Sequence, residues 1–325
     1  MHASLDTAGE RLAIDCSLPW VMELIAEGAN GELRRVEAAD PSLRVRIESD
    51  RRAFDTRGWE LVARGAWRRN GDVVVENPCT SGFDLHLSRT PEGAEFTYRW
   101  RPPARDRAVA RLLRSRFHLL ARATLIQYPA LWWAGTRGRA PLHASACAAG
   151  ATTPLLTAPS GIGRSTLLLA ELASGARTTG DNLAVGDGTT VWGLVEPVRV
   201  EGGHGRRMPH GRSEVALEDR ADSLMPDRIV VLERGRSVSP SLSTCRSEAA
   251  VRTLVTSTYM AGELRRYWPF AATLAAATGL GPSHAPITEV ASAFAAMLPC
   301  FTLALGRNPG GVRLSDLLDN AEVAA

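Results

Sequence analysis

The chain contains no lysine, so all 38 basic side chains among its 325 residues are arginine. This absence excludes chemistry that needs a side-chain amine, such as a Schiff base, a lysine general base or a lysine bound to phosphate. Together with abundant alanine and glycine, it is most simply explained by codon bias in a GC-rich genome. It does not by itself indicate nucleic-acid binding.

An excess of charge of one sign is also lacking. The formal net charge is +3, which is too small for this length to indicate DNA or an anionic membrane as a partner. The longest apolar stretch, residues 290–305, is short and contains Pro299, so it predicts a buried helix followed by a strand rather than a membrane span. The first eleven residues lack the apolar core of a signal peptide, and we expect a cytoplasmic protein.

Cysteine is scarce and widely spaced. No two of the five cysteines have the spacing of a zinc finger or a redox pair, which predicts free and mostly buried thiols (Cys16, Cys79, Cys147, Cys245, Cys300). His204 and His210 have no carboxylate or cysteine at metal-ligand spacing, so they do not predict a zinc site.

The first part of the chain, residues 1–135, has the pattern of a smaller, sheet-rich α+β domain. Residues 43–47 (LRVRI) alternate apolar and charged side chains, as a half-buried strand does. Further strands are expected at residues 59–62, 72–75, 83–87 and 95–100, and one helix near residues 19–26. We expect this part to contribute to docking of a partner or peptide.

Residues 104–125 predict one amphipathic helix. Its apolar residues should lie on one side (Val109, Leu112, Leu113, Phe117, Leu120) and its arginines on the other. Between Arg99 and Arg139 there are ten arginines and a single acid, Asp106. This surface is either a docking face for an acidic or peptide partner or simply a solvated helix face.

From about residue 136 to the C-terminus, the pattern changes to short apolar runs that alternate with helices, which is typical of an α/β domain. Helices are expected at residues 247–256, 262–278 and 287–298. Arg265, Arg266, Tyr267 and Trp268 either contact a peptide or nucleotide base, or belong to a helix packed on the core.

The strongest motif is PLLTAPSGIGRSTLLLAEL, residues 154–172. A short apolar strand, a loop with Gly161 and Gly163, and a helix would place backbone N–H groups and a helix N-terminus around one point, where a nucleotide phosphate can bind. Ser165 has the position at which a hydroxyl coordinates Mg²⁺. The alternative is a tight strand-to-helix turn without a ligand.

The motif departs from the usual phosphate loop at two positions. Ala158 replaces the first glycine and Arg164 replaces the lysine. Arginine keeps the charge and can bind phosphate oxygens in a bidentate manner, but it is too long and planar for the compact position of a lysine. Either the loop shifts to accommodate Arg164, or nucleotide binding persists with weakened catalysis.

The order of segments resembles the catalytic domain of the HPr kinase/phosphorylase family, especially diverged relatives found beside peptide natural-product genes. The resemblance rests on HASA (143–146), APSGIGRSTL (158–167), GARTTGDNLAV (175–185) and VWGLVEPVRV (191–200). It covers residues 141–200 well and the C-terminal part, through residues 314–318, more loosely. It does not extend to the first hundred residues.

The resemblance implies a P-loop domain of the phosphoenolpyruvate-carboxykinase type over residues 136–325. It implies ATP and Mg²⁺ as cofactors and phosphoryl transfer to a serine or threonine hydroxyl of a peptide or protein. By position, the nucleotide would be held by the loop residues (Ser160, Gly161, Ile162, Gly163, Arg164, Ser165, Thr166). His143, Arg164 and Asp181 would be catalytic, and Ser165 and Asp181 would bind the metal.

The departures from the family pattern lie at positions that the resemblance assigns to catalysis. Asn182 replaces the second of two paired acids, and Arg164 replaces the lysine. Asp181 alone could act as a base or bind Mg²⁺ through water. The alternative function is therefore a catalytically degenerate accessory protein that binds a nucleotide or peptide.

Residues 202–212 (GGHGRRMPHGR) form a basic, glycine-rich stretch. Arg206, Arg207 and Arg212 would close on phosphate or hold the substrate peptide; alternatively, the stretch is a surface loop. The sequence leaves the oligomeric state open, a homo-oligomer included.

Overall fold

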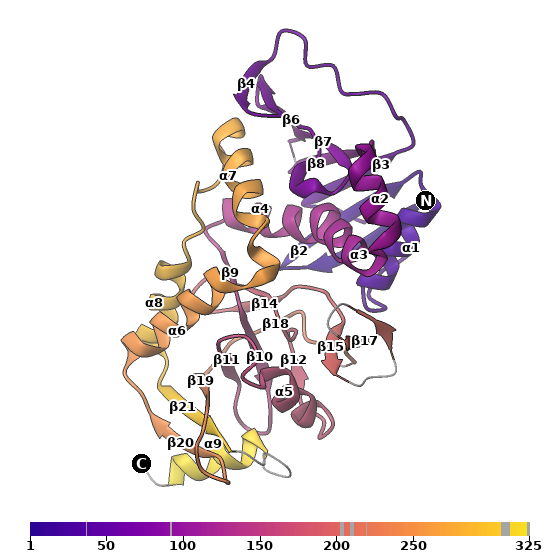
Figure 1. The fold of residues 1–325 in the computed structure, drawn as a ribbon. Helices are drawn as coiled ribbons and strands as arrows, with labels where there is room; N and C mark the ends of the chain where they lie inside the picture. The colour runs from indigo at the N-terminus through magenta and orange to yellow at the C-terminus, as the bar shows by residue number, and fades with distance from the viewer. Residues whose placement is uncertain are drawn as a thin grey trace.

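The structure, a computed structural model, describes residues 1–36, 38–91, 93–201, 205–208, 211–218, 220–306 and 313–323. The N-terminal sheet and the C-terminal sheets form two parts stacked along the long direction of the molecule (Figure 1). Both parts combine helices and strands, so the protein is a sheet-rich α/β structure.

The first part contains an eight-stranded sheet with the order β1-β2-β3-β8-β7-β6-β5-β4. Strands β2 and β8 both run parallel to β3, and all other neighbours are antiparallel. Leu43, Val45 and Ile47 of β3 are buried, as their alternation predicts. The strands are β1 (His2–Thr7), β2 (Glu10–Cys16), β3 (Leu43–Glu48), β4 (Glu60–Ala63), β5 (Ala66–Arg69), β6 (Asp72–Val75), β7 (Phe83–Arg89) and β8 (Ala94–Trp100).

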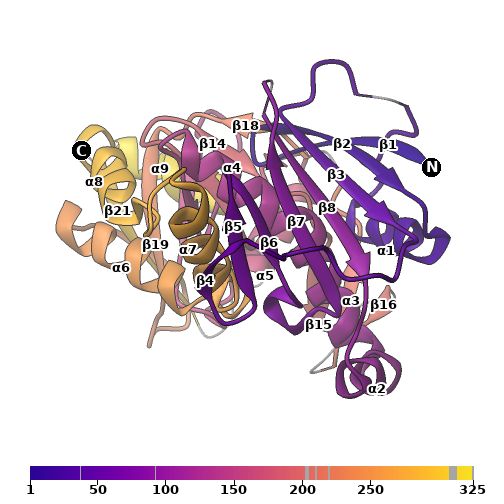
Figure 2. The same cartoon turned by 90° about the horizontal axis from the view of Figure 1, so that it is seen from above.

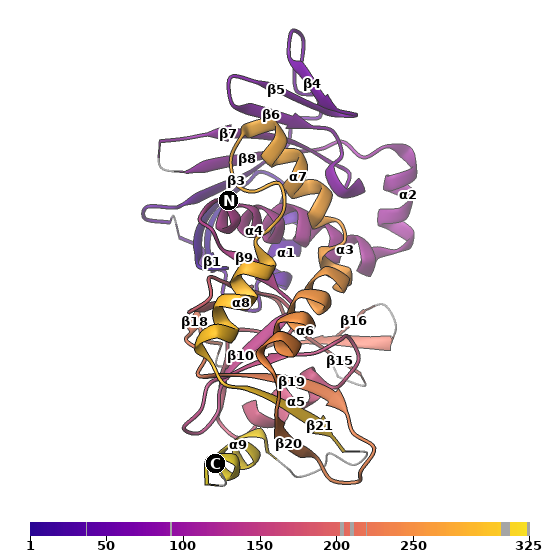
Figure 3. The same cartoon turned by 90° about the vertical axis from the view of Figure 1, so that its left-hand side faces the viewer.

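Helices from distant parts of the sequence pack against this sheet. Helix α1 (Pro19–Gly28) contacts β2, α4 (Tyr128–Thr136) contacts β2 and β3, and α7 (Tyr267–Thr278) contacts β4, β5 and β6. Figures 2 and 3 show α7 lying beside the β4–β6 end of the sheet. One apolar cluster therefore includes residues of both parts, from Ala3 to Ala277.

The single helix expected over residues 104–125 is wrong. The chain forms α2 (Ala104–Leu112) and α3 (Arg114–Arg122), separated by Leu113 with φ −117° and ψ 53°, followed by a π-helical turn, η2 (Ala123–Gln127). No residue of α2 is buried, and Leu112 is 81% exposed. The break changes the direction of the chain, so Val109, Leu112 and Leu113 do not continue the face that α3 presents to the core.

The second part is built on a six-stranded sheet with the order β12-β10-β11-β19-β21-β20, in which β11, β19 and β21 are parallel. Two smaller sheets, β18-β14-β13-β9 and β15-β17-β16, lie beside it. The strands are β9 (Ala140–Leu142), β10 (Ala144–Ala148), β11 (Pro154–Thr157), β12 (Arg177–Thr178), β13 (Ala184–Gly186), β14 (Val191–Gly193), β15 (Val198–Glu201), β16 (Arg206–Arg207), β17 (Arg212–Val215), β18 (Ser223–Leu224), β19 (Arg228–Arg234), β20 (Ser241–Thr244) and β21 (Cys300–Leu305).

The remaining helices confirm the main sequence patterns. The apolar stretch at residues 290–305 contains the end of a helix followed by a strand, as expected. The helix expected at residues 262–278 is divided at Arg265 and Arg266 into a short turn and a helix. Tyr267 is buried. The elements are α5 (Arg164–Leu172), α6 (Ser247–Met260), η4 (Gly262–Leu264), α8 (Ile287–Met297) and α9 (Leu314–Val323), with η1 (Pro78–Thr80) in the first part.

The turn between β1 and β2 joins the two parts. The Ala8 amide donates to the Gly193 carbonyl at 2.8 Å, and the Val195 amide donates to the Thr7 hydroxyl at 2.9 Å. The buried carboxylate of Glu10 pairs with Arg139 at 3.2 Å. These bonds fix residues 193–195 against the first sheet. The division of the chain at residues 135 and 136 stays a prediction.

All five cysteines are free thiols, and three of them are buried (Cys16, Cys147, Cys300). Among the helices that the structure describes, none has both the length and the apolar character needed to cross a membrane.

Candidate functional site

The glycine-containing loop follows β11, as the sequence indicates. The four residues of β11 are buried, and α5 begins at Arg164 directly after the loop. Gly161 has φ +80° and Gly163 has φ +120°, a region that side chains rarely adopt. A Cβ at Gly161 would meet nothing within 4 Å, so the space beside the loop is open. The loop and the first turn of α5 can therefore present backbone N–H groups to an anion.

Ser165 and Asp181 meet beside this loop. The Ser165 hydroxyl donates to Oδ2 of Asp181 at 2.7 Å. Asp181 is 7% exposed, and its Oδ1 has no hydrogen-bond partner among the described residues. The two residues that the resemblance assigned to one metal site are thus in contact, with one carboxylate oxygen left over.

Arg164 points into the protein core. Its side chain donates through Nη1 to the His143 carbonyl at 2.8 Å and through Nη2 to the Asn182 carbonyl at 3.3 Å, while Nη2 lies 3.0 Å from Nε2 of His143. The residue is 7% exposed. Burial lowers the pKa of Arg164, but an arginine keeps its charge at neutral pH. The guanidinium at the lysine position is therefore committed to internal partners.

His143 is held as a neutral acceptor for that guanidinium. Burial, and then the charge of Arg164, lowers the pKa of His143 to about 4. The backbone amide of His143 donates to the Thr258 hydroxyl at 3.0 Å, which ties the residue to α6. Since a neutral imidazole has one free nitrogen lone pair, Nε2 accepts from Arg164 and Nδ1 carries the proton. Nδ1 and the Asn182 amide nitrogen are both buried without a partner in the described structure.

Arg234 places a second cation at the loop. It is the last residue of β19, which runs parallel to β11, and its Nη2 donates to the Gly161 carbonyl at 2.9 Å. The side chain is exposed, so its remaining N–H groups face solvent beside the loop. Arg234, unlike Arg164, has donors that can reach a ligand there.

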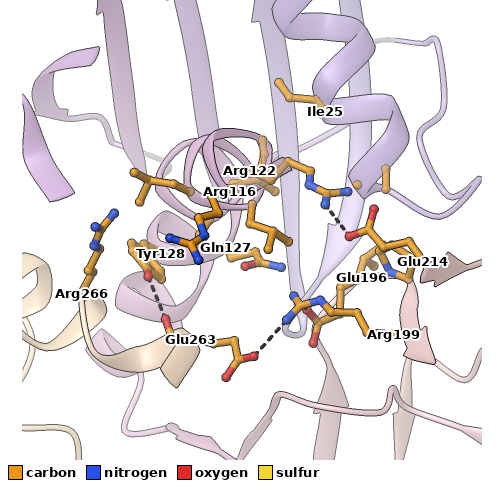
Figure 4. A pocket seen from close by; sticks show the side chains of 18 of the residues that line it. Ile25, Arg116, Arg122, Gln127, Tyr128, Glu196, Arg199, Glu214, Glu263 and Arg266 are labelled. Atoms are coloured by element: carbon orange, nitrogen blue, oxygen red, sulfur yellow. Dashed lines mark hydrogen bonds and ion pairs between the residues drawn. The ribbon is translucent and has the colours of Figure 1, made fainter. Parts of the chain in front are cut away.

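A chain of buried and partly buried charges begins one segment away. Arg199 donates to Glu263 at 2.9 Å and to Glu196 at 3.2 Å, and Tyr128 donates to the Glu263 carbonyl at 2.8 Å (Figure 4). Residues 194–199 follow β14, and the Leu194 amide contacts the Leu183 carbonyl, two residues after Asp181, at 3.4 Å. Arg199, Glu196 and Glu263 therefore lie next to the loop site.

The Arg199 guanidinium is shared by two carboxylates, Glu196 and Glu263, and it does not stabilise the charge of both equally. Burial raises the pKa of Glu196 to about 7, and the nearby Glu263 adds to this shift, although Arg199 opposes it. Burial acts to lower the pKa of Arg199, but Glu196 and Glu263 outweigh it, and the net shift is upward. Glu196 is 5% exposed, and its Oε1 has no partner in the described part of the chain.

The arginines predicted to bind substrate lie elsewhere. Arg206 contacts Glu27 and His118 of the first part, and Arg207 and Arg212 are exposed on β16 and β17. Across the described ranges, no bond joins these three residues to the loop or to Asp181. His204 and His210 lie outside the described residues. The substrate role of the three arginines stays a prediction.

Sequence reasoning missed four charged residues near the site: Arg234, Glu196, Arg199 and Glu263. Arg234 had a usable signal, because an apolar strand running parallel to the loop strand brings its C-terminal end to the same sheet edge. Glu196, Arg199 and Glu263 had none, since their proximity depends on how residues 194–199 and η4 pack.

No protein-family model matches this chain, and no curated protein matches it. Among solved structures, the Hpr(Ser) kinase/phosphatase from Coxiella burnetii aligns over 57% of this chain and 97% of its own, with 12% sequence identity and a TM-score of 0.30.

Proposed function

We propose that this protein is an ATP- and Mg²⁺-dependent phosphotransferase whose acceptor is a serine or threonine hydroxyl of a peptide or protein. The contact between Ser165 and Asp181 carries the proposal. A hydroxyl and a carboxylate at 2.7 Å, at the start of a helix that follows a glycine loop, are the donor set for a magnesium ion bound to nucleotide phosphates.

The residues fit this pair of cofactors. Asp181 has an unpartnered Oδ1, and magnesium takes oxygen ligands from one or two protein groups while the phosphates and water supply the rest. The open space beside Gly161 leaves room for a phosphate against the backbone. When bound, Mg²⁺-ATP would supply the transferable phosphoryl group and neutralise its charge.

The side chains around the loop would then have different roles. Ser160, Gly161, Ile162, Gly163 and Thr166 belong to the phosphate cradle, and Ser165 and Asp181 would hold the metal. Arg234 would contribute the exposed cation, because its free N–H groups lie beside the loop. Arg164 and His143 would act by holding residues 181–182 in place rather than by touching phosphate.

A second candidate function follows from the same geometry. The guanidinium of Arg164 is bonded to His143, and Asn182 stands where the family has a second acid, so the site has lost two charges that would face the nucleotide. These observations favour an accessory protein that binds a nucleotide or peptide without transferring phosphate.

Thermal unfolding with Mg²⁺-ATP, Mg²⁺-ADP and Mg²⁺ alone tests the shared claim of nucleotide binding. A nucleotide at ~100 times its Kd stabilises the native state by ~2.7 kcal/mol. No shift with any nucleotide, in protein shown to be folded by circular dichroism, would overturn the phosphotransferase and leave only an accessory protein that binds a peptide.

Transfer activity separates the two candidates. ADP release from Mg²⁺-ATP is measured with a panel of serine-containing peptides, for the wild type and for the double variant Arg164→Lys/Asn182→Asp. Activity in the wild type supports the phosphotransferase. Nucleotide binding with activity only in the double variant supports the accessory protein.

A further inference from the structure

A cavity of about 530 Å³ lies where the two parts meet. Its walls come from α1, α3 and η2 of the first part and from residues 195–199 and η4 of the second. Apolar side chains line much of it (Leu5, Ile25, Leu120, Ile126, Val195). Pockets of about 300–1,000 Å³ that combine apolar walls with a few fixed polar groups are typical small-molecule sites.

One fixed polar group in the wall is Arg122. It is 6% exposed and pairs with the buried Glu214 at 2.5 Å (Figure 4). Only one edge of the guanidinium is used, because Nη1 is buried and has no partner among the described residues. Gly28 makes this position possible, since a Cβ there would lie 2.2 Å from Cδ of Arg122. The cavity thus holds a charged hydrogen-bond donor in a fixed position.

The lining also includes an acceptor without a partner within the described ranges. Glu196 is bonded to Arg199 through Oε2, and its Oε1 is buried without a partner in the described structure. In Figure 4, Arg122 comes from the helical side of the cavity and Glu196 from the second part. A buried donor or acceptor that lacks a partner is costly, so both groups favour a ligand that supplies the missing bonds.

The rim adds positive charge. Arg116, Arg265 and Arg266 line the cavity and are exposed, and none of them is within ion-pair distance of a carboxylate in the described ranges. With Arg122 and Arg199, five arginines face three glutamates (Glu196, Glu214, Glu263). This excess favours an anionic ligand over a neutral or cationic one.

We propose that this cavity binds a small amphipathic carboxylic acid that also carries a hydroxyl or amino group. The carboxylate would bond Nη1 of Arg122 and be attracted by the rim arginines, in the charge-assisted geometry that arginine favours. The hydroxyl or amine would donate to Oε1 of Glu196. The apolar body would lie against Ile25, Leu120 and Ile126.

The cavity adjoins the loop site but has its own lining residues. Neither the loop residues nor Ser165 and Asp181 line it. The proposal therefore stands whether or not the chain transfers phosphate, and binding can be measured without nucleotide.

Four probes that differ by one group at a time test the chemistry: 3-phenyllactate, L-phenylalanine, 3-phenylpropionate and phenylalaninamide. Binding to the full chain is measured by isothermal titration calorimetry and ligand-observed NMR, without ATP. We expect saturable binding of phenyllactate or phenylalanine at millimolar concentration or below. We expect about tenfold or greater weakening when the carboxylate or the donor group is removed. No saturable binding by any of the four would overturn the proposal.

Variants then locate the binding. Glu196→Leu keeps a similar volume but removes the acceptor oxygens. Arg116→Ala removes a rim charge at an exposed position whose side chain has no ion pair in the described structure. Arg111→Ala, on exposed α2 and outside the cavity, is the matched control. We expect both cavity variants to weaken binding at least severalfold and the control to leave it unchanged. Binding that none of the cavity variants alters would place the ligand elsewhere and overturn the assignment. Nucleotide binding with no carboxylate binding would overturn this site and leave the proposed function standing.

Discussion

The Arg164 guanidinium spans two acceptors on a single residue, the backbone carbonyl of His143 at 2.8 Å and its ring Nε2 at 3.0 Å. A lysine ammonium has no planar fork with which to reach both. The contact makes Arg164 an internal support, which links the loop helix α5 to the residue before β10. Burial, and then the charge of Arg164, lowers the pKa of His143 and keeps its ring neutral.

Arg164→Lys should therefore weaken the fold. The shorter side chain would leave His143 or the Asn182 carbonyl without its donor, and we expect a loss of about 1–3 kcal/mol in the free energy of unfolding. Chemical denaturation monitored by circular dichroism measures it. Arg177→Lys, on an exposed position of β12, is the control and should change stability by less than ~0.5 kcal/mol. Equal stability of the two variants would show that the bonds to His143 do not support the fold.

Asp181→Asn should separate metal binding from folding. An asparagine oxygen can still accept from the Ser165 hydroxyl, so the variant should remain folded, but it removes the charge that a metal ion needs. We expect the stabilisation by Mg²⁺-ATP to fall by ~1 kcal/mol or more, from the ~2.7 kcal/mol expected at 100 times Kd. Thermal shift in the presence and absence of Mg²⁺ measures this. Asp40→Asn, at an exposed position before β3, should respond to nucleotide as the wild type does.

The regular elements could be read from the sequence because local patterns determine them. The alternation in residues 43–47 and the strand, loop and helix around Gly161 and Gly163 depend on neighbours in the chain, and both appear where the pattern places them. The break at Leu113 had no comparable signal. The helix periodicity runs through residues 104–125 without a proline or glycine, and only packing decides that α2 leaves the core.

The charged residues of the site could likewise be predicted from the sequence only in part. The sequence identifies Ser165 and Asp181 through a motif, and the structure brings them into contact. It does not reveal that Arg164 turns inward, because the direction of a long side chain depends on which acceptors lie around it. Glu196 and Glu263 are 67 residues apart in the chain and meet through Arg199, which no spacing rule predicts.

Glu196→Gln should change how stability depends on pH. Burial raises the pKa of Glu196 from 4.5 to about 7, with Arg199, Glu263 and Asp181 as its charged neighbours. The folded chain therefore holds a proton that the unfolded chain has released. Stability contributed by this group is present below about pH 4.5 and is lost as the pH rises through about 7.

Glu196→Gln has no carboxyl group at this position, so it does not lose this stability as the pH rises. Its free energy of unfolding relative to the wild type should rise between about pH 4.5 and pH 7, by up to ~1.4 kcal/mol per pH unit, and level off above. His143 titrates in part of this range but is common to both proteins, so the difference isolates Glu196. Denaturation at a series of pH values measures it, with Glu248→Gln at an exposed position of α6 as the control. A difference that does not vary with pH would show that Glu196 is not desolvated.

Gly28→Ala tests how the cavity wall is built. Gly28 ends α1, where alanine is otherwise the better helix former, but a Cβ would lie 2.2 Å from Cδ of Arg122. Arg122 must then move, which strains its buried bond to Glu214, and we expect a loss of about 1–3 kcal/mol. Gly135 in α4 offers the contrast, since a Cβ there meets nothing within 4 Å, and Gly135→Ala should be neutral or stabilise by up to ~1 kcal/mol. Opposite signs for the two variants in denaturation experiments would show that Gly28 is required by the side chain of Arg122 and not by the helix. If Gly28→Ala were as harmless as Gly135→Ala, Arg122 would be free to leave Glu214, and the cavity would lose the fixed donor on which its ligand preference depends.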